Sequence, residues 1–156
     1  MAQPTILLVE DDPNDVLLIQ RAFRKANLVN PVQVVTDGDA AVAYLAGEGV
    51  YADREHYPLP VVILLDLKLP RRSGLEVLEW MRGQPHLHNL PVVVLTSSRE
   101  NADIQRAYDL CANSFLVKPV APAEMLEMVK TLGLYWLVLN QRPDTDGEAF
   151  CLRRPR

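Results

Sequence analysis

Residues 61–66 read Val-Val-Ile-Leu-Leu-Asp, five apolar residues followed by an acid. Polar residues also close three other short apolar runs: Asp11-Asp12 close the run over residues 6–9, Thr96 follows residues 92–95, and Lys118 follows residues 115–117. Continuous apolar runs separated by amphipathic segments are typical of parallel strands that are buried on both faces. Ligands of open parallel sheets bind beyond the carboxyl ends of the strands. We therefore expect these polar residues to meet at one edge of a sheet.

The polar residues at this edge form a chemically specific set. Three carboxylates, Asp11, Asp12 and Asp66, repel one another, so one of them must protonate or the group must attract a cation. Oxygen ligands suit a hard divalent metal, and Lys118 and Thr96 suit phosphoryl oxygens. Each residue alone has a plainer interpretation, since Asp12 is a typical helix cap and Lys118 a typical solvated lysine. The five residues together, at the ends of four strands, favour the functional interpretation.

The order of these motifs resembles the receiver domain of two-component response regulators. The resemblance covers roughly residues 4–140 and rests on residues 7–12, on 65–67 with Pro70 and Gly74, on 95–97 and on 115–119. It implies a doubly wound (βα)5 flavodoxin-like fold, a five-stranded parallel sheet in the order 2-1-3-4-5. It also implies that Asp66 accepts a phosphoryl group.

The resemblance implies further roles at the same edge. Magnesium, with manganese as a substitute, would be held by Asp11, Asp12, Asp66 and the backbone carbonyl of Lys68. Thr96, Ser97 and Lys118 would surround the phosphoryl group, and Phe115 would be the aromatic switch residue. A cis bond before Pro119 would aim Lys118 into the site. Lys68 and Ser98 occupy the positions that tune dephosphorylation, and a lysine at the first departs from the usual residue, so the phosphoryl lifetime stays open.

Hydrophobic periodicity predicts five strand–helix alternations. The expected strands are about 5–10, 31–36, 60–65, 91–95 and 114–117. The first expected helix begins at Pro13, and the other four span about 39–46, 74–84, 99–111 and 121–140. Asp12 is the expected cap of the first helix and Gly47 the expected end of the second. The connection over residues 48–58 is long for this kind of fold.

Composition fits one receiver domain over residues 1–140 with a tail over 141–156. The 156 residues are 49% hydrophobic, carry a net charge of −4 and contain no run near the ~20 apolar residues of a membrane span. No secretory signal opens the chain, and two distant residues, Cys111 and Cys151, suggest reduced thiols, so we expect a cytoplasmic protein. The acidic balance argues against a nucleic-acid partner.

The last helix predicts an interface. On a helical wheel Met125, Met128, Val129, Leu132, Trp136 and Leu139 form an inward stripe. A second stripe on the far side, with its neighbours, predicts a homodimer interface made of Leu126, Leu134, Tyr135, Leu137 and Val138. The tail is either disordered or an arm that packs on the second subunit. Residues 133–140 also resemble regulators that serve bacterial and cyanobacterial phytochrome kinases.

We therefore expect a receiver that takes a phosphoryl group on Asp66 from a sensor histidine kinase, with a phytochrome as the candidate, and that is not an enzyme. Its output would be the face of the fourth helix, fifth strand and fifth helix. One alternative is a dimeric adaptor without phosphorylation. A haloacid-dehalogenase phosphatase would need an acid at position 68, where Lys68 stands, and a flavodoxin would need a phosphate loop after the first strand, which is missing.

Overall fold

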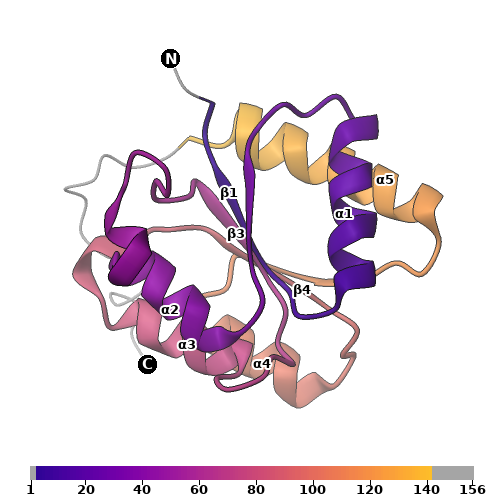
Figure 1. The fold of residues 1–156 in the computed structure, drawn as a ribbon. Helices are drawn as coiled ribbons and strands as arrows, with labels where there is room; N and C mark the ends of the chain where they lie inside the picture. Colours follow the sequence, from indigo (N-terminus) through magenta and orange to yellow (C-terminus); the bar gives the residue numbers. More distant parts are fainter. Residues whose placement is uncertain (1–2, 142–156) are drawn as a thin grey trace.

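The computed structural model describes residues 3–141, and Figure 1 shows a central sheet with helices on both sides. All five strands are parallel, and their order β2-β1-β3-β4-β5 confirms the predicted doubly wound fold. The strands are β1 (Ile6–Val9), β2 (Val32–Val35), β3 (Val62–Leu65), β4 (Val92–Thr96) and β5 (Ser114–Val117).

Two helix layers cover the sheet. α1 (Pro13–Lys25) packs beside α5 (Pro122–Leu132) on one face, while α2 (Gly38–Ala46), α3 (Gly74–Arg82) and α4 (Asn101–Asp109) cover the other. Because successive strand residues point to opposite faces, Ile6 and Leu8 join the core under α1 and α5, whereas Leu7 and Val9 join the core under α2 and α3. This burial on both faces explains why the strands are continuously apolar.

The helix termini follow the sequence signals. Asp12 caps α1 by accepting a hydrogen bond at 2.8 Å from the N–H group of Asn14, and Pro13 occupies the first turn. α2 ends at Gly47 as predicted, because that residue adopts a left-handed conformation with φ of 72° that favours glycine.

The long α2–β3 connection is ordered by aromatic and cationic contacts. It contains the short 3₁₀ helix η1 (Gly49–Ala52), and the rings of Tyr51 and Tyr57 pack against Tyr44 of α2. Arg54 donates hydrogen bonds to the carbonyls of Tyr44 and Leu45, which lie in the last turn of α2. A second short 3₁₀ helix, η2 (Pro85–Leu87), precedes β4.

The C-terminal helix differs from the prediction of one helix over 121–140. α5 ends at Leu132 and continues as a π-helix, η3 (Gly133–Leu139). A π-helix has i→i+5 hydrogen bonds, so its wider turn shifts the facing of every residue after Gly133 relative to an α-helical wheel. Leu137, predicted on the far side, packs instead against the core, and Leu139, predicted to face inward, is exposed.

The inward part of the stripe before the π-helix is confirmed, since Met125 and Val129 are buried. Beyond it, four large apolar side chains are exposed to more than half of their area; we call Leu134, Tyr135, Val138 and Leu139 the C-terminal patch. The tail that was predicted as a disordered segment or an arm lies outside the described residues. No helix within residues 3–141 is long and apolar enough to cross a membrane.

Candidate functional site

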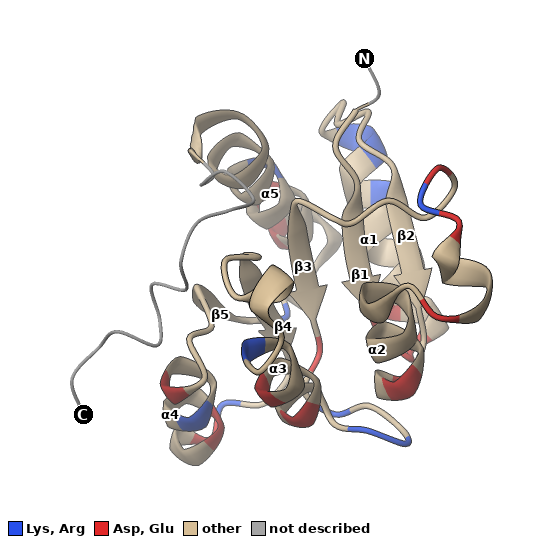
Figure 2. Ribbon diagram, turned by 90° about the vertical axis from the view of Figure 1, so that its left-hand side faces the viewer, with Lys and Arg blue, Asp and Glu red and all other residues tan. Residues whose placement is uncertain are grey.

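The predicted polar residues gather at the carboxyl edge of the sheet. Asp11 follows β1, Asp66 follows β3, Thr96 closes β4 and Lys118 follows β5. Glu10, which the sequence analysis did not assign to the site, directly precedes Asp11. Figure 2 shows that acidic residues at the helix ends and the cationic loop between β3 and α3 lie on the side to which the strands point. The topology thus brings together residues that are far apart in the chain, as the switch-point rule predicts.

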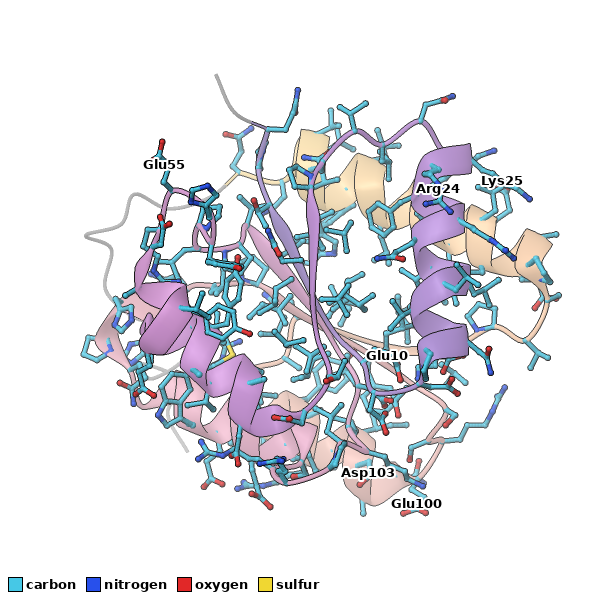
Figure 3. All side chains as sticks on the ribbon, viewed as in Figure 1. Glu10, Arg24, Lys25, Glu55, Glu100 and Asp103 are labelled. Carbon is cyan, nitrogen blue, oxygen red and sulfur yellow. The ribbon has the colours of Figure 1, made fainter. Side chains whose placement is uncertain are left out.

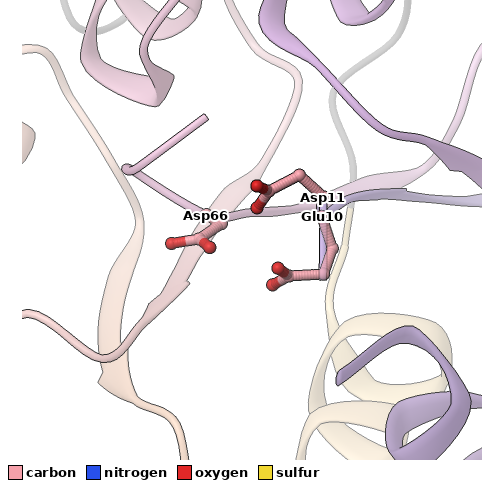
Figure 4. A group of neighbouring side chains, drawn as sticks. All are labelled: Glu10, Asp11 and Asp66. Carbon is pink, nitrogen blue, oxygen red and sulfur yellow. The ribbon is translucent and has the colours of Figure 1, made fainter. Parts of the chain in front are cut away.

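Three carboxylates form an acidic cluster at this edge. One oxygen each of Glu10, Asp11 and Asp66 lie within 4.8 Å of one another, and Figure 4 shows the three side chains converging. Asp66 and Glu10 are almost fully buried, at 6% and 1% exposure, whereas Asp11 is exposed. Oxygen donors at this spacing fit a hard divalent cation such as Mg²⁺, which uses few carboxylates and keeps several waters.

The prediction that Asp12 belongs to this cluster is wrong, because the acidic pair lies one residue earlier. Glu10 extends β1, since its N–H group donates to the carbonyl of Val35 at 3.0 Å. The chain then turns, and the N–H group of Asp12 donates to Oε1 of Glu10 at 3.1 Å. Asp12 therefore points to α1, which it caps. Glu10 occupies the position in the cluster that the sequence analysis had assigned to Asp12.

Lys118 lies among three carboxylates. Its Nζ is 2.5 Å from Glu10 Oε2, 2.9 Å from Asp15 Oδ2 and 3.0 Å from Asp66 Oδ2. The lysine side chain is only 10% exposed, so solvent screens these contacts weakly. Asp15 was absent from the predicted site, and the only sequence signal for it was an acid in the first turn of α1.

Burial and ion pairing shift two pKa values here. Burial raises the pKa of Glu10 to about 7, and the hydrogen bond from Lys118 opposes this only in part. Burial by itself lowers the pKa of Lys118, but hydrogen bonds to Glu10, Asp15 and Asp66 outweigh it and raise that pKa above its ordinary value. Lys118 is therefore a fixed cation, whereas Glu10 can exchange a proton near neutral pH.

Backbone contacts hold Asp66 in place. Its N–H group donates to the carbonyl of Val9 at 3.1 Å, and its Oδ1 accepts from the N–H group of Leu67 at 2.7 Å. A Cβ atom on Gly74 would lie 2.1 Å from the carbonyl oxygen of Asp66, so only glycine lets α3 begin against this loop. Oδ2 remains directed to Lys118.

The end of β4 connects the edge to α4. Thr96 is fully buried, and its Oγ1 accepts a hydrogen bond from the N–H group of Ser98 at 3.3 Å. The Ser98 hydroxyl in turn donates to Asp103 of α4 at 2.6 Å. Glu10, Glu100 and Asp103 lie on the same side of the molecule in Figure 3. Ser97, in contrast, is exposed.

Two residues around Lys118 complete the comparison with the predictions. Phe115 is partly buried and packs against the core under α2, α3 and α4. The bond between Lys118 and Pro119 is trans, because no peptide bond of the described residues is cis, so the predicted cis bond is wrong for this structure. Trans is the more stable form of X–Pro bonds by about 0.5–1 kcal/mol, and Lys118 reaches Asp66 from this backbone.

Comparison with known proteins places this geometry in a family. The profile described as response regulator receiver domain matches residues 6–130. Response regulator Rcp1 of Synechocystis sp. is 38% identical over 132 residues, which cover 85% of this chain and 88% of Rcp1. The probable methanogenesis regulatory protein FilR2 of Methanothrix harundinacea is 38% identical over 141 residues, covering 88% and 86% of the two chains.

Solved structures agree. The phosphorylated cyanobacterial phytochrome response regulator RcpA superposes with a TM-score of 0.84 at 38% identity, covering 92% of this chain and all of RcpA. The Mn²⁺-bound form of Rcp1 gives a TM-score of 0.80 at 36% identity, covering 90% of this chain and 99% of Rcp1.

Proposed function

This chain belongs to the response regulator receiver domain family, and from that premise we propose that it is a phosphorylation switch whose phosphoryl acceptor is Asp66. The observation that supports this most directly is the contact of Lys118 with an Asp66 carboxylate that also belongs to an acidic cluster. A nucleophile, a fixed cation and a set of metal ligands then share one edge.

Each residue has a distinct part in the proposed reaction. A carboxylate oxygen of Asp66 attacks the phosphorus of a phosphohistidine, the phosphorus–nitrogen bond breaks, and its electron pair stays with the imidazole. Lys118 and Thr96 then donate hydrogen bonds to phosphoryl oxygens. Glu10, Asp11 and Asp66 would hold Mg²⁺, or Mn²⁺, together with the carbonyl of Lys68, and bound Mg²⁺ supplies neutralisation of phosphoryl charge.

The relatives support the same chemistry by analogy. RcpA was crystallised in a phosphorylated form and Rcp1 with Mn²⁺. These states belong to those proteins, and we extend them to this chain because it supplies the matching acids, hydroxyl and lysine at the strand ends.

Labelling with acetyl phosphate tests this function. The wild type should gain one phosphoryl group, seen by intact mass, only when Mg²⁺ or Mn²⁺ is present. Asp66→Asn should not be labelled. Its matched control, Asp109→Asn, removes an exposed carboxylate of α4 and should be labelled like the wild type. Failure of the wild type to be labelled by acetyl phosphate or by any histidine kinase would favour the alternative of an adaptor that works without phosphorylation.

We propose that the switch runs through Thr96 and Lys118. Phosphorylation adds about −1.5 to −2 charges and new acceptor oxygens. When the Thr96 hydroxyl turns to these oxygens, its bond with Ser98 changes, and Ser98 contacts Asp103 of α4. Phe115 would move toward the space left by Thr96, which alters the face of α4, β5 and α5. Ser97 would leave room for the phosphoryl group.

Beryllofluoride with Mg²⁺ tests the switch without a kinase. The amide signals of residues 96–118, which include α4, should shift, whereas the amide signals of α2 should change little. Unchanged spectra around residues 96–118 at saturating beryllofluoride would refute the switch.

The phosphodonor we propose is a sensor histidine kinase, with a phytochrome as the leading candidate because RcpA is a phytochrome response regulator. Phosphotransfer from a panel of the organism's autophosphorylated kinases should reveal one fast donor. If that donor carries no phytochrome chromophore domain, the phytochrome part of this proposal is wrong while the rest stands.

We also propose a homodimer that forms through the C-terminal patch, with residues 1–140 as the receiver domain and 141–156 as a C-terminal tail or dimerisation arm. Leu126 is partly buried, and Leu137 is excluded because it packs against the core. Exposed apolar side chains next to one another are typical of protein interfaces. Light scattering at micromolar concentration should give the dimer mass, and a monomer would refute the interface.

A further inference from the structure

The three carboxylate partners of Lys118 are not equivalent. Glu10 and Asp66 belong to the acidic cluster that fits a divalent cation, whereas Asp15 comes from the first turn of α1 and lies outside it. Among the described contacts, Asp15 is thus the only carboxylate that holds the Lys118 ammonium group without also facing the cation position.

Local structure explains why Asp15 is available. In a capping box, the Glu or Gln side chain three residues after the cap accepts a hydrogen bond from the N–H group of the cap residue, and Asp15 stands at this position. Here the N–H group of Asp12 donates to Glu10 Oε1 instead, at 3.1 Å. The Asp15 carboxylate therefore does not take part in this capping bond, and its Oδ2 accepts a hydrogen bond from Lys118 Nζ at 2.9 Å.

A divalent cation changes the balance around Lys118. Once Glu10 and Asp66 bind the cation, their oxygens are shared with a double positive charge that repels the nearby ammonium group. The Asp15 side chain is only 32% exposed and is not a member of the acidic cluster, so it would not share its oxygens with the cation. It can then retain the ammonium group at the edge.

We propose that Asp15 is a positioning residue that keeps the Lys118 ammonium group beside Asp66 while Glu10 and Asp66 hold the divalent cation. This inference rests on the proposed function for its role in phosphoryl transfer. In its absence the cation would displace Lys118 from the edge, and the phosphoryl group would lose a preplaced hydrogen-bond donor.

The ammonium signal of Lys118 in a proton–nitrogen spectrum tests the positioning directly. Three carboxylates should slow its hydrogen exchange enough to make it visible, and Lys118→Arg identifies it by its loss. In the wild type the signal should persist at saturating Mg²⁺. In Asp15→Asn it should be present without metal and vanish with Mg²⁺, whereas Asp15→Glu, which keeps the charge, should retain it.

The control Glu124→Gln removes an exposed acid from the first turn of α5 and should behave like the wild type. A signal that persists in Asp15→Asn with Mg²⁺, or one that vanishes with Mg²⁺ in the wild type as well, would overturn the inference. Neither result depends on phosphorylation, so failure of this inference is distinguishable from failure of the proposed function.

Kinetics provide the second measurement. At saturating Mg²⁺, Asp15→Asn should be labelled by acetyl phosphate about tenfold more slowly than the wild type, which corresponds to about 1.4 kcal/mol. Asp15→Glu should recover most of the rate. Equal rates for Asp15→Asn and the wild type would show that Asp15 has no positioning role.

Discussion

The side chains at the carboxyl edge of the sheet and those of the C-terminal patch differ in their contacts and in their exposure to solvent. At the edge, the ammonium group of Lys118 has three carboxylate partners and is nearly buried. At the patch, Leu134, Tyr135 and Val138 are 55%, 54% and 66% exposed. The interactions at the charged edge can change when a further charge, such as a phosphoryl group, is added. The environment of the apolar patch changes only when a partner buries it.

The two regions also lie at opposite ends of the strands. Tyr135 and Trp136 of η3 line a common hollow with Pro91 and Ser114, which stand at the beginnings of β4 and β5. Asp66 stands beyond the end of β3. A partner bound at the C-terminal patch would therefore leave the acidic cluster accessible, so we expect the proposed self-association and the proposed phosphorylation each to be removable without loss of the other.

The largest expected effect is at the edge. Asp66→Asn should abolish labelling by acetyl phosphate, because an amide is not a nucleophile for phosphorus under these conditions. It should leave the dimer mass unchanged, since Asp66 is far from the patch. Intact mass and light scattering measure the two results. Labelling of the Asp66→Asn protein would show that the phosphoryl acceptor is another residue.

The reciprocal change at the patch comes next. Leu134→Glu with Val138→Glu should raise the dimer dissociation constant at least about a hundredfold, since burying each such side chain stabilises by roughly 1.5–3 kcal/mol. Labelling of Asp66 should stay at the wild-type rate. Sedimentation at several concentrations measures the constant.

Leu137→Ala is the matched comparison within the same π-helix. Because Leu137 packs against the core, this change should lower the free energy of unfolding by about 2 kcal/mol with little effect on the association of the folded protein. A double patch variant that dimerises like the wild type would show that the interface lies elsewhere.

A pH dependence should distinguish the edge from the patch. Between the ordinary pKa of 4.5 and about 7, the folded metal-free protein holds a proton on Glu10 that the unfolded chain has lost, so this group's contribution to stability falls as pH rises through that window. Mg²⁺ binding requires Glu10 to release this proton. The apparent Mg²⁺ affinity should therefore be about tenfold weaker at pH 6 than at pH 8.

Titration calorimetry at the two pH values measures this affinity. Glu10→Gln should bind Mg²⁺ more weakly at both pH values and lose the dependence. Dimer dissociation, which involves no group of this kind in the C-terminal patch, should change little over the same range. An unchanged Mg²⁺ affinity between pH 6 and pH 8 would contradict the proton on Glu10.

The same two regions mark how far the sequence could be interpreted. The parallel sheet and the meeting of Asp66 and Lys118 were predictable because apolar runs with polar ends indicate parallel strands and a ligand edge, whereas the strand order was implied only by the resemblance to receiver domains. The C-terminal helix was not predictable, because a wheel with a fixed turn cannot anticipate a π-helix, which depends on tertiary packing. At Gly133 an added Cβ would lie 2.6 Å from Leu28, a contact that no local pattern reports.

Within the edge itself, the error was one residue. The sequence Glu10-Asp11-Asp12 offers three adjacent acids, and only the last ladder hydrogen bond of β1 decides which two face Asp66. Asp15 was missed for a related reason, since an acid in the first turn of a helix is ordinarily explained by the helix dipole. Lys118, which it contacts, is 103 residues away in sequence.

The smallest expected effect tests this correction. Asp12→Ala should lower the free energy of unfolding by about 1 kcal/mol, because it removes the cap of α1, and should leave Mg²⁺ affinity within about twofold of the wild type. Asp11→Ala should do the reverse, weakening Mg²⁺ binding strongly with little loss of stability, since Asp11 is exposed and belongs to the cluster. Urea denaturation and calorimetry on both variants separate a cap from a ligand. If Asp12→Ala lost Mg²⁺ binding as fully as Asp11→Ala, the acidic pair would be Asp11 and Asp12 after all, and Glu10 would serve only to hold Lys118.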